Sequence, residues 1–298
     1  MTYSIVARDP ESGELGVAVQ SHWFAAGIVC WARPGVGAVA TQATALIDHG
    51  PLALELLERG LGAEAALRVR GEADRDFAVR QVAVLDPSGA VAVHTGESCI
   101  PEAGHHVGDG YSCQANMMRR TTVWDAMADA FERARGPLAE RLLAALDAGE
   151  AEGGDLRGRQ AARVLVVRGS PTDRPWEDVR LDLRVDDHPE PLGEIRRLLE
   201  LTRAYDRLER AEDLELAGDL EGALDERRAA IRGSGANPEA GFWTAVSLAV
   251  QGGVDQARPL VAAAVEADPG WADLLRRLGE RRLSGMTPET AAALLREG

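Results

Sequence analysis

The order of the expected secondary-structure elements constrains the fold more than any other feature of this sequence. Strand-like alternation appears early in the chain, at 2–8, 15–21, 27–32 and 36–43. A helix is predicted next, from about Gly50 to Arg70. Later strands are predicted at 80–85, 90–95, 111–115, 162–167 and 179–185, and helices near 121–134 and 137–149. This order is typical of helices packed on mostly antiparallel sheets and not of regular βαβ winding. We therefore predict an α+β fold, specifically a four-layer αββα sandwich.

From about Pro191 the pattern changes to helices alone. The run 217–223 recurs as 251–257, an offset of 34 residues, and Ile231 and Val265 keep the same offset. That offset is the period of tetratricopeptide-type helix pairs, although a small helical bundle with coincidental similarity fits nearly as well. The predicted regions are an αβ domain at 1–190, a linking helix at 191–210 and a small all-α, tetratricopeptide-like domain at 211–298.

Composition and charge exclude several classes of function. The formal net charge of −15 argues against nucleic acid or anionic membranes as general partners. No apolar run is long enough to span a bilayer, and no signal peptide is evident, so we expect a cytoplasmic protein. All 33 basic residues are Arg, which excludes any mechanism that needs a Lys base or Schiff base. The three Cys are too few and too scattered for a disulfide framework.

The first residues carry the clearest indication of chemistry. A small residue after the initiator Met normally permits removal of that Met, which would leave Thr2 with a free α-amine. A Thr hydroxyl beside its own α-amine is one way to build a self-activated nucleophile. With a pKa of about 7.7–8, the amine would suit general-base catalysis at neutral pH. The alternative is that Thr2 simply begins a β-strand, where Thr is common.

Ordered short runs through about residue 200 extend this hypothesis. They lie at 2–9, 16–21, 35–42, 80–82, 94–96, 114–117, 153–160 and 183–189. In these runs the chain resembles the domain-of-unknown-function family 1028. That family is similar in fold to the N-terminal nucleophile hydrolases, whose sandwich holds the N-terminal residue at its mouth. The resemblance implies an amide or peptide-type hydrolase. The tail, through 237–243 and 267–271, resembles a helical domain that often follows this family and carries a peptidoglycan-binding label.

Several side chains could complete a site around Thr2. An amide N–H from Gln42 or Asn116 could stabilise an oxyanion, and Thr41 could hydrogen-bond the N-terminal amine. A strand-end cap is an equal alternative for Thr41 and Gln42. Without Lys, positive charge near Thr2 would have to come from Arg or from His22, although an exposed turn position is as plausible for that His.

The Gly-rich loop at 153–160 supplies a second group of candidates. Asp155, Arg157 and Arg159 stand beside flexible glycines, and paired guanidinium N–H groups could hold a substrate carboxylate. A salt-bridged surface loop would have the same composition. His94, His105 and His106 invite a metal site, but their spacing and the absence of partner carboxylates argue against one. No metal or cofactor is predicted.

Two functions are compatible with these observations. The first is an amidohydrolase that cleaves an amide or peptide-type bond of a small molecule or short peptide, with Thr2 as the nucleophile. The second is a non-catalytic protein of the same fold that binds a ligand or a partner. A protein or glycan partner on the helical tail and a homo-oligomer both remain open.

Overall fold

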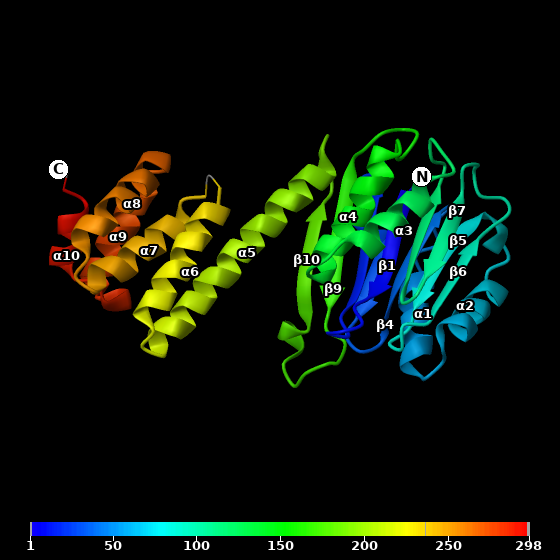
Figure 1. Ribbon diagram of the computed structural model, residues 1–298, viewed down its shortest axis with the longest axis horizontal. Helices are drawn as coiled ribbons and strands as arrows, with labels where there is room; N and C mark the ends of the chain where they lie inside the picture. Colours follow the sequence, from blue (N-terminus) through cyan, green and yellow to red (C-terminus); the bar gives the residue numbers. More distant parts are fainter. Residues whose placement is uncertain (1, 236, 297–298) are drawn as a thin grey trace. The chain divides into compact units, whose positions relative to one another are not determined.

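The chain divides into two units, Met1–Arg196 and Arg197–Gly298, in the computed structural model, which describes residues 2–235 and 237–296. The first unit combines strands with helices, and the second is helical (Figure 1). Among the helices in these described ranges, none has both the length and the apolar character needed to cross a bilayer.

The strands of the first unit form two antiparallel sheets. The larger has the order β10-β9-β2-β1-β8-β7 and the smaller β3-β4-β5-β6. The larger sheet comprises β1 (Thr2–Arg8), β2 (Leu15–Ser21), β7 (Gly104–Gly108), β8 (Tyr111–Asn116), β9 (Ala161–Val167) and β10 (Val179–Val185). The smaller sheet comprises β3 (Cys30–Arg33), β4 (Gly37–Ala43), β5 (Arg80–Leu85) and β6 (Val91–Thr95).

Strand β1 lies in the interior of the larger sheet, between β2 and β8. Local sequence explains the β1–β2 hairpin, because the Asp9 carboxylate accepts the backbone N–H groups of Glu11 and Ser12. Gly13 follows with a φ of 74°, a left-handed conformation that costs glycine little. On the other side of β1, Thr2 stands directly opposite Asn116 of β8. Strand β1 therefore has hydrogen-bonded neighbours on both sides.

Each sheet carries a pair of helices on one face, and the two sheets meet through the other. Helices α1 (His49–Glu58) and α2 (Ala63–Glu72) cover the smaller sheet, and α3 (Val123–Arg133) and α4 (Leu138–Ala151) cover the larger one (Figure 1). Apolar side chains from both sheets, among them Val6, Val17, Ala40 and Leu85, form the core between them. The first unit is thus layered as helices, sheet, sheet and helices.

Three details differ from the sequence prediction. The single helix expected from Gly50 to Arg70 was wrong, because Gly60 adopts a φ of 92° and separates α1 from α2. Strand β7 was not predicted. It lies at a sheet edge and none of its residues is fully buried, so its sequence lacks a clear apolar alternation. Strand β3 starts at Cys30, later than expected, because a short 3₁₀ turn (Ala26–Val29) precedes it.

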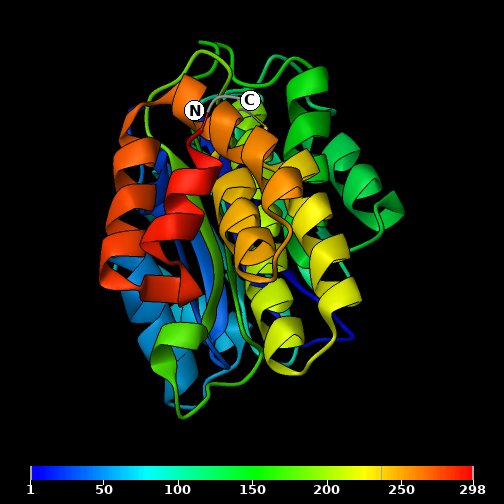
Figure 2. The same ribbon diagram turned by 90° about the vertical axis from the view of Figure 1, so that its left-hand side faces the viewer.

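The second unit is built from consecutive helices packed against one another. Helix α5 (Pro191–Leu216) crosses the boundary between the units and is followed by α6 (Leu220–Gly233), α7 (Glu239–Val250), α8 (Val254–Ala267), α9 (Gly270–Arg281) and α10 (Pro288–Leu294). Figure 2 shows α6 to α10 from a second direction, coloured from yellow to red. The two copies of the sequence repeat occupy equivalent places. Gly218 and Gly252 turn the chain with positive φ, and Ala223 and Ala257 are buried in the helices that follow.

Candidate functional site

The layer between the two sheets changes from apolar to polar toward the start of β1. Neighbouring residues on a strand face opposite sides, so Thr2 and Ser4 point to the same side as Val6. Val6 lies in the apolar core, whereas Ser4 donates to the Gln42 side chain of the facing sheet at 2.7 Å. The buried polar residues gathered here are Thr2, Ser4, Ser21, Gln42, Gln81, Gln114 and Asn116. Such a concentration of buried amides and hydroxyls is costly unless they bond to one another.

Thr2 is fixed from both sides of the sandwich. Its hydroxyl donates to the Ser21 hydroxyl at 3.1 Å. Its backbone carbonyl accepts from Nε2 of Gln42 at 3.2 Å and from Nδ2 of Asn116 at 3.3 Å. The residue is 8% exposed, so its hydroxyl stands at the margin of the buried layer. Met1, whose removal the sequence predicts, lies outside the described residues.

Gln81 joins these groups, and sequence reasoning missed it. Its Oε1 accepts from Gln42 at 2.7 Å and from Asn116 at 3.1 Å. Its fully buried amide nitrogen faces the carbonyls of Ala115 at 2.9 Å and Gly104 at 3.0 Å. Gln81 also stands directly opposite Gln42 in the β4–β5 register. The available signal was a Gln directly before four apolar residues of a buried strand.

A cavity of about 390 Å³ opens beside Thr2, and we call it the Thr2 cavity. It is lined by Thr2, Ser21, Trp23, Ala26, Ile28, Val29, Gln42, Ala43, Thr44, Ala45, Ile47 and Arg157. Most of these side chains are apolar, and Arg157 is the one charged residue among them. Trp23 is 65% exposed and Ile28 49%, so apolar side chains that water reaches form part of its wall. A mostly apolar hollow with a few convergent polar groups is the usual form of a small-molecule site.

One wall of the Thr2 cavity is the loop that follows β4. Ala43, the last residue of β4, leads into this loop with an unusual left-handed φ of 69°. The Arg80 guanidinium donates to the carbonyl of Thr44 at 2.6 Å and to the Asp74 carboxylate at 2.9 Å. His49 contacts the same carboxylate at 2.9 Å, and burial lowers the pKa of this His. The buried Arg80–Asp74 pair therefore holds the loop in place.

The structure separates Thr41 from Gln42, although they are neighbours in sequence. Gln42 faces the other sheet and lines the Thr2 cavity. Thr41 points to the opposite side of β4, where its hydroxyl donates to the Leu46 carbonyl at 3.3 Å. In this geometry Thr41 supports the loop after β4 and does not contact Thr2.

The loop at 153–160 is organised by Asp155. Its carboxylate, which is buried, accepts the backbone N–H of His22 at 2.9 Å and that of Arg157 at 2.8 Å. It also pairs with the Arg157 guanidinium at 3.2 Å. Arg157 lines the Thr2 cavity. Arg159 instead pairs with the Glu150 carboxylate at 3.0 Å, and the His22 ring contacts the Arg159 carbonyl at 3.2 Å.

The predicted site residues thus fall into two groups. Thr2, Gln42 and Arg157 line the Thr2 cavity. Asn116 does not line it, but donates to the backbone carbonyl of Thr2. The remaining predicted residues do not line the cavity but form hydrogen bonds or ion pairs in the loops around it, and they are His22, Thr41, Asp155 and Arg159.

Two of the cysteines, Cys30 and Cys113, are buried. Burial raises the pKa of Cys30 to about 12 and that of Cys113 well above its ordinary value, so both thiols stay protonated at neutral pH. Across residues 2–235 and 237–296, no group of three or more His, Cys, Asp or Glu side chains is arranged to hold a metal ion.

Comparisons with known proteins show the family to which the first unit belongs. A model described as a family of unknown function, DUF1028, matches residues 2–195. Among solved structures, the chain is similar to protein SPO2555 from Silicibacter pomeroyi, described with the same family, at 30% identity and a TM-score of 0.60. That similarity covers 67% of this chain and 88% of the other. No curated protein matches. The family match spans well over half of the sequence, and the chain belongs to the DUF1028 family.

Proposed function

We propose that this protein is an amidohydrolase of the N-terminal nucleophile type. One observation carries the proposal: Thr2 stands at the wall of a mostly apolar cavity, with its hydroxyl and its carbonyl both held by buried partners. A nucleophile must be fixed relative to its substrate, and buried hydrogen bonds on two sides provide that order. The layering of helices, sheet, sheet and helices supports the same assignment.

The reaction proceeds in two steps once Met1 is absent. The Thr2 Oγ attacks the amide carbon, and the α-amine of Thr2 accepts the hydroxyl proton, directly or through a water. The carbon–nitrogen bond then breaks, the amine product leaves with that proton, and an acyl ester remains on Thr2. Water attacks this ester, releases the acid and restores the hydroxyl. No Lys is needed, because the α-amine is the base.

The amides of Gln42 and Asn116 take a different role from the one expected. Each already donates within the buried layer, to the Thr2 carbonyl and to Gln81. We therefore assign them to positioning Thr2. Backbone N–H groups in the cavity wall are the better oxyanion donors. That of Ala45 is one candidate, because within the described residues it has no hydrogen-bond acceptor.

The walls of the Thr2 cavity suggest the class of substrate. Apolar side chains from two loops would bury an acyl group or an apolar amino-acid side chain. Arg157 stands in the same wall, where its guanidinium could also meet a carboxylate. A small N-acyl amino acid or short peptide has both an apolar group for the apolar side chains and a carboxylate for Arg157. The repeat-related helices of the second unit resemble tetratricopeptide pairs, and we assign them a partner-binding role.

The test begins with the mass of the purified protein. Loss of Met1 is expected, and quantitative retention would end the α-amine mechanism. The processed protein is then treated with a β-lactone or activated ester. Acylation should map to Thr2, disappear in Thr2→Ala and persist in Thr2→Ser. All three chains have a small second residue, so Met1 removal is matched. Thr121→Ala, at an exposed position outside the cavity, is the control.

One observation favours a non-catalytic ligand-binding protein as the second candidate. The amide donors nearest Thr2 are already used inside the protein. Retained Met1, or equal labelling of the wild type and Thr2→Ala, would support that function instead.

A further inference from the structure

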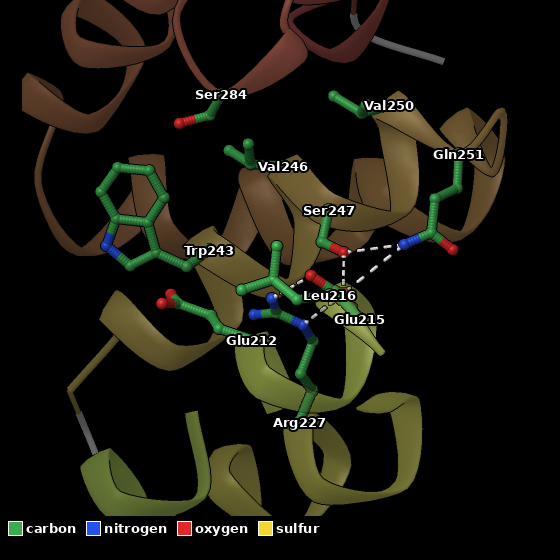
Figure 3. A pocket seen from close by; sticks show the side chains of 10 residues that line it. All are labelled: Glu212, Glu215, Leu216, Arg227, Trp243, Val246, Ser247, Val250, Gln251 and Ser284. Carbon is green, nitrogen blue, oxygen red and sulfur yellow. Dashed lines mark hydrogen bonds and ion pairs between the residues drawn. The ribbon is translucent and has the colours of Figure 1, made fainter. Parts of the chain in front are cut away.

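The second unit has a cavity of its own, of about 490 Å³, which we call the Trp243 cavity (Figure 3). It is lined by Glu212, Glu215, Leu216, Arg227, Trp243, Val246, Ser247, Val250, Gln251 and Ser284. These residues come from α5, α6 and α7 and from the turn after α9. The cavity lies wholly within the second unit, so its chemistry is independent of the function proposed for Thr2.

Arg227 is the most unusual residue of this cavity, because it is charged and only 4% exposed. The Glu215 carboxylate accepts from its Nε at 3.1 Å and from its Nη2 at 2.9 Å. Ser247 donates to the same carboxylate at 2.5 Å. The remaining nitrogen, Nη1, has no hydrogen-bond acceptor in the described part of the chain, and it points away from Glu215 in Figure 3. A ligand oxygen at the cavity wall could accept a hydrogen bond from this nitrogen.

Glu212 contributes a negative charge to the cavity, in contrast to the hydrogen-bond donor of Arg227. It lies on α5 at the cavity wall and forms no ion pair with any described residue. The Arg207 and Arg210 side chains of the same helix form their ion pairs with Glu226 and not with Glu212. Arg227 and Glu215 neutralise each other, so Glu212 leaves the cavity with one net negative charge. The electrostatics favour a cationic ligand group.

The remaining walls fit an organic cation attached to an apolar body. The Trp243 indole offers a ring face, and indoles are the side chains that attract organic cations most strongly. Leu216, Val246 and Val250 add aliphatic surface, and Leu216 is 88% exposed at the opening. Burying these groups beneath a ligand would be favourable.

We propose that the Trp243 cavity binds a short peptide segment with a basic residue beside an aliphatic one. The ammonium or guanidinium group is held by Glu212 and the Trp243 ring. A peptide carbonyl accepts from Nη1 of Arg227. The aliphatic side chain packs against the Leu216 wall.

The experiment titrates the full chain with three capped dipeptides, monitored by calorimetry. They are N-acetyl-Leu-Arg-amide, N-acetyl-Leu-norleucine-amide and N-acetyl-Leu-Glu-amide. The Thr2→Ala background is used alongside the wild type so that hydrolysis at Thr2 does not contribute heat. We expect saturable binding of the Arg peptide, with the other two at least about tenfold weaker. Binding of the Arg peptide should also weaken as NaCl is raised.

Two variants locate the bound cation. Glu212→Gln should weaken the Arg peptide about five- to tenfold while leaving the norleucine peptide unchanged. Glu266→Gln, on an exposed part of α8 outside the cavity, is the matched control and should change nothing. The proposal is overturned if the three peptides bind equally, if the Glu peptide binds best, if the Arg peptide does not bind, or if both variants behave like the wild type. The outcome of the Thr2 labelling experiment, which tests the proposed hydrolase function, does not affect the interpretation of these peptide-binding results.

Discussion

Replacing Gln81 by Leu gives the sharpest test of the buried polar layer. The change keeps a side chain of similar size and removes every polar atom. Nε2 of Gln81 lies near three oxygens, those of Thr95, Gly104 and Ala115, but its two hydrogens allow two bonds at once. Oε1 accepts two more from neighbouring amides. About four hydrogen bonds are therefore lost together.

The size of the effect follows from that count. At about 1 kcal/mol for each net hydrogen bond, the loss is about 4 kcal/mol, and the added apolar burial of Leu returns only part of it. We expect the free energy of unfolding to fall by about 3 kcal/mol. Gln42 and Asn116 would also lose the acceptor that orients them toward Thr2. Thr2 labelling should therefore slow in protein that is still folded.

Urea denaturation, followed by far-ultraviolet circular dichroism, measures the stability change, and the β-lactone reaction measures the positioning of Thr2. Gln256→Leu is the matched control, because that Gln is an exposed residue of α8. A loss below about 1 kcal/mol in Gln81→Leu, equal to that of the control, would refute the reasoning.

Three other perturbations test the surrounding structure. A hydrogen bond from Arg80 holds the pKa of Asp74 well below its usual range, so this carboxylate stabilises the fold above about pH 4 and the contribution is lost as pH falls further. In denaturation experiments between pH 6 and 2, the free energy of unfolding of Asp74→Asn should therefore fall less steeply with pH than that of the wild type. Equal slopes would contradict this. The thiol of Cys30, with its pKa raised to about 12, should resist iodoacetamide at pH 8 until the protein unfolds, as read by peptide mass mapping; rapid native labelling would exclude its burial. In Gly50→Ala the new Cβ would lie 2.0 Å from the Trp31 ring, so the free energy of unfolding from thermal denaturation should fall by about 2 kcal/mol. An unchanged midpoint would disprove the close packing of α1 on β3.

Local sequence accounts for much of the fold. The hairpin of β1 and β2 needs only alternating residues and the turn from Asp9 to Gly13, and both are visible in the sequence. Where local signals were weak, prediction failed. Strand β7 exists because β8 offers it a partner, and the break between α1 and α2 depends on a single glycine.

The candidate site divides in the same way. Thr2 could be proposed from its position alone, and Gln42 from a polar residue that ends a strand of small side chains. Thr41 could not be separated from Gln42, because the side of β4 that faces the other sheet is set by packing. Arg157 and Arg159 were equal candidates in the sequence, whereas in the structure Arg157 lines the cavity and Arg159 pairs with Glu150 instead.

The sequence by itself determined most of the elements, their order and the residue at the start of the central strand, because these depend on periodicity and on neighbours a few positions away. Tertiary structure alone decided that Gln42, Gln81 and Asn116 gather beside Thr2, since they come from three strands distant from β1 in the chain. Hydrogen bonds across two sheets, together with a cavity lined from separate loops, form only when those strands pack face to face.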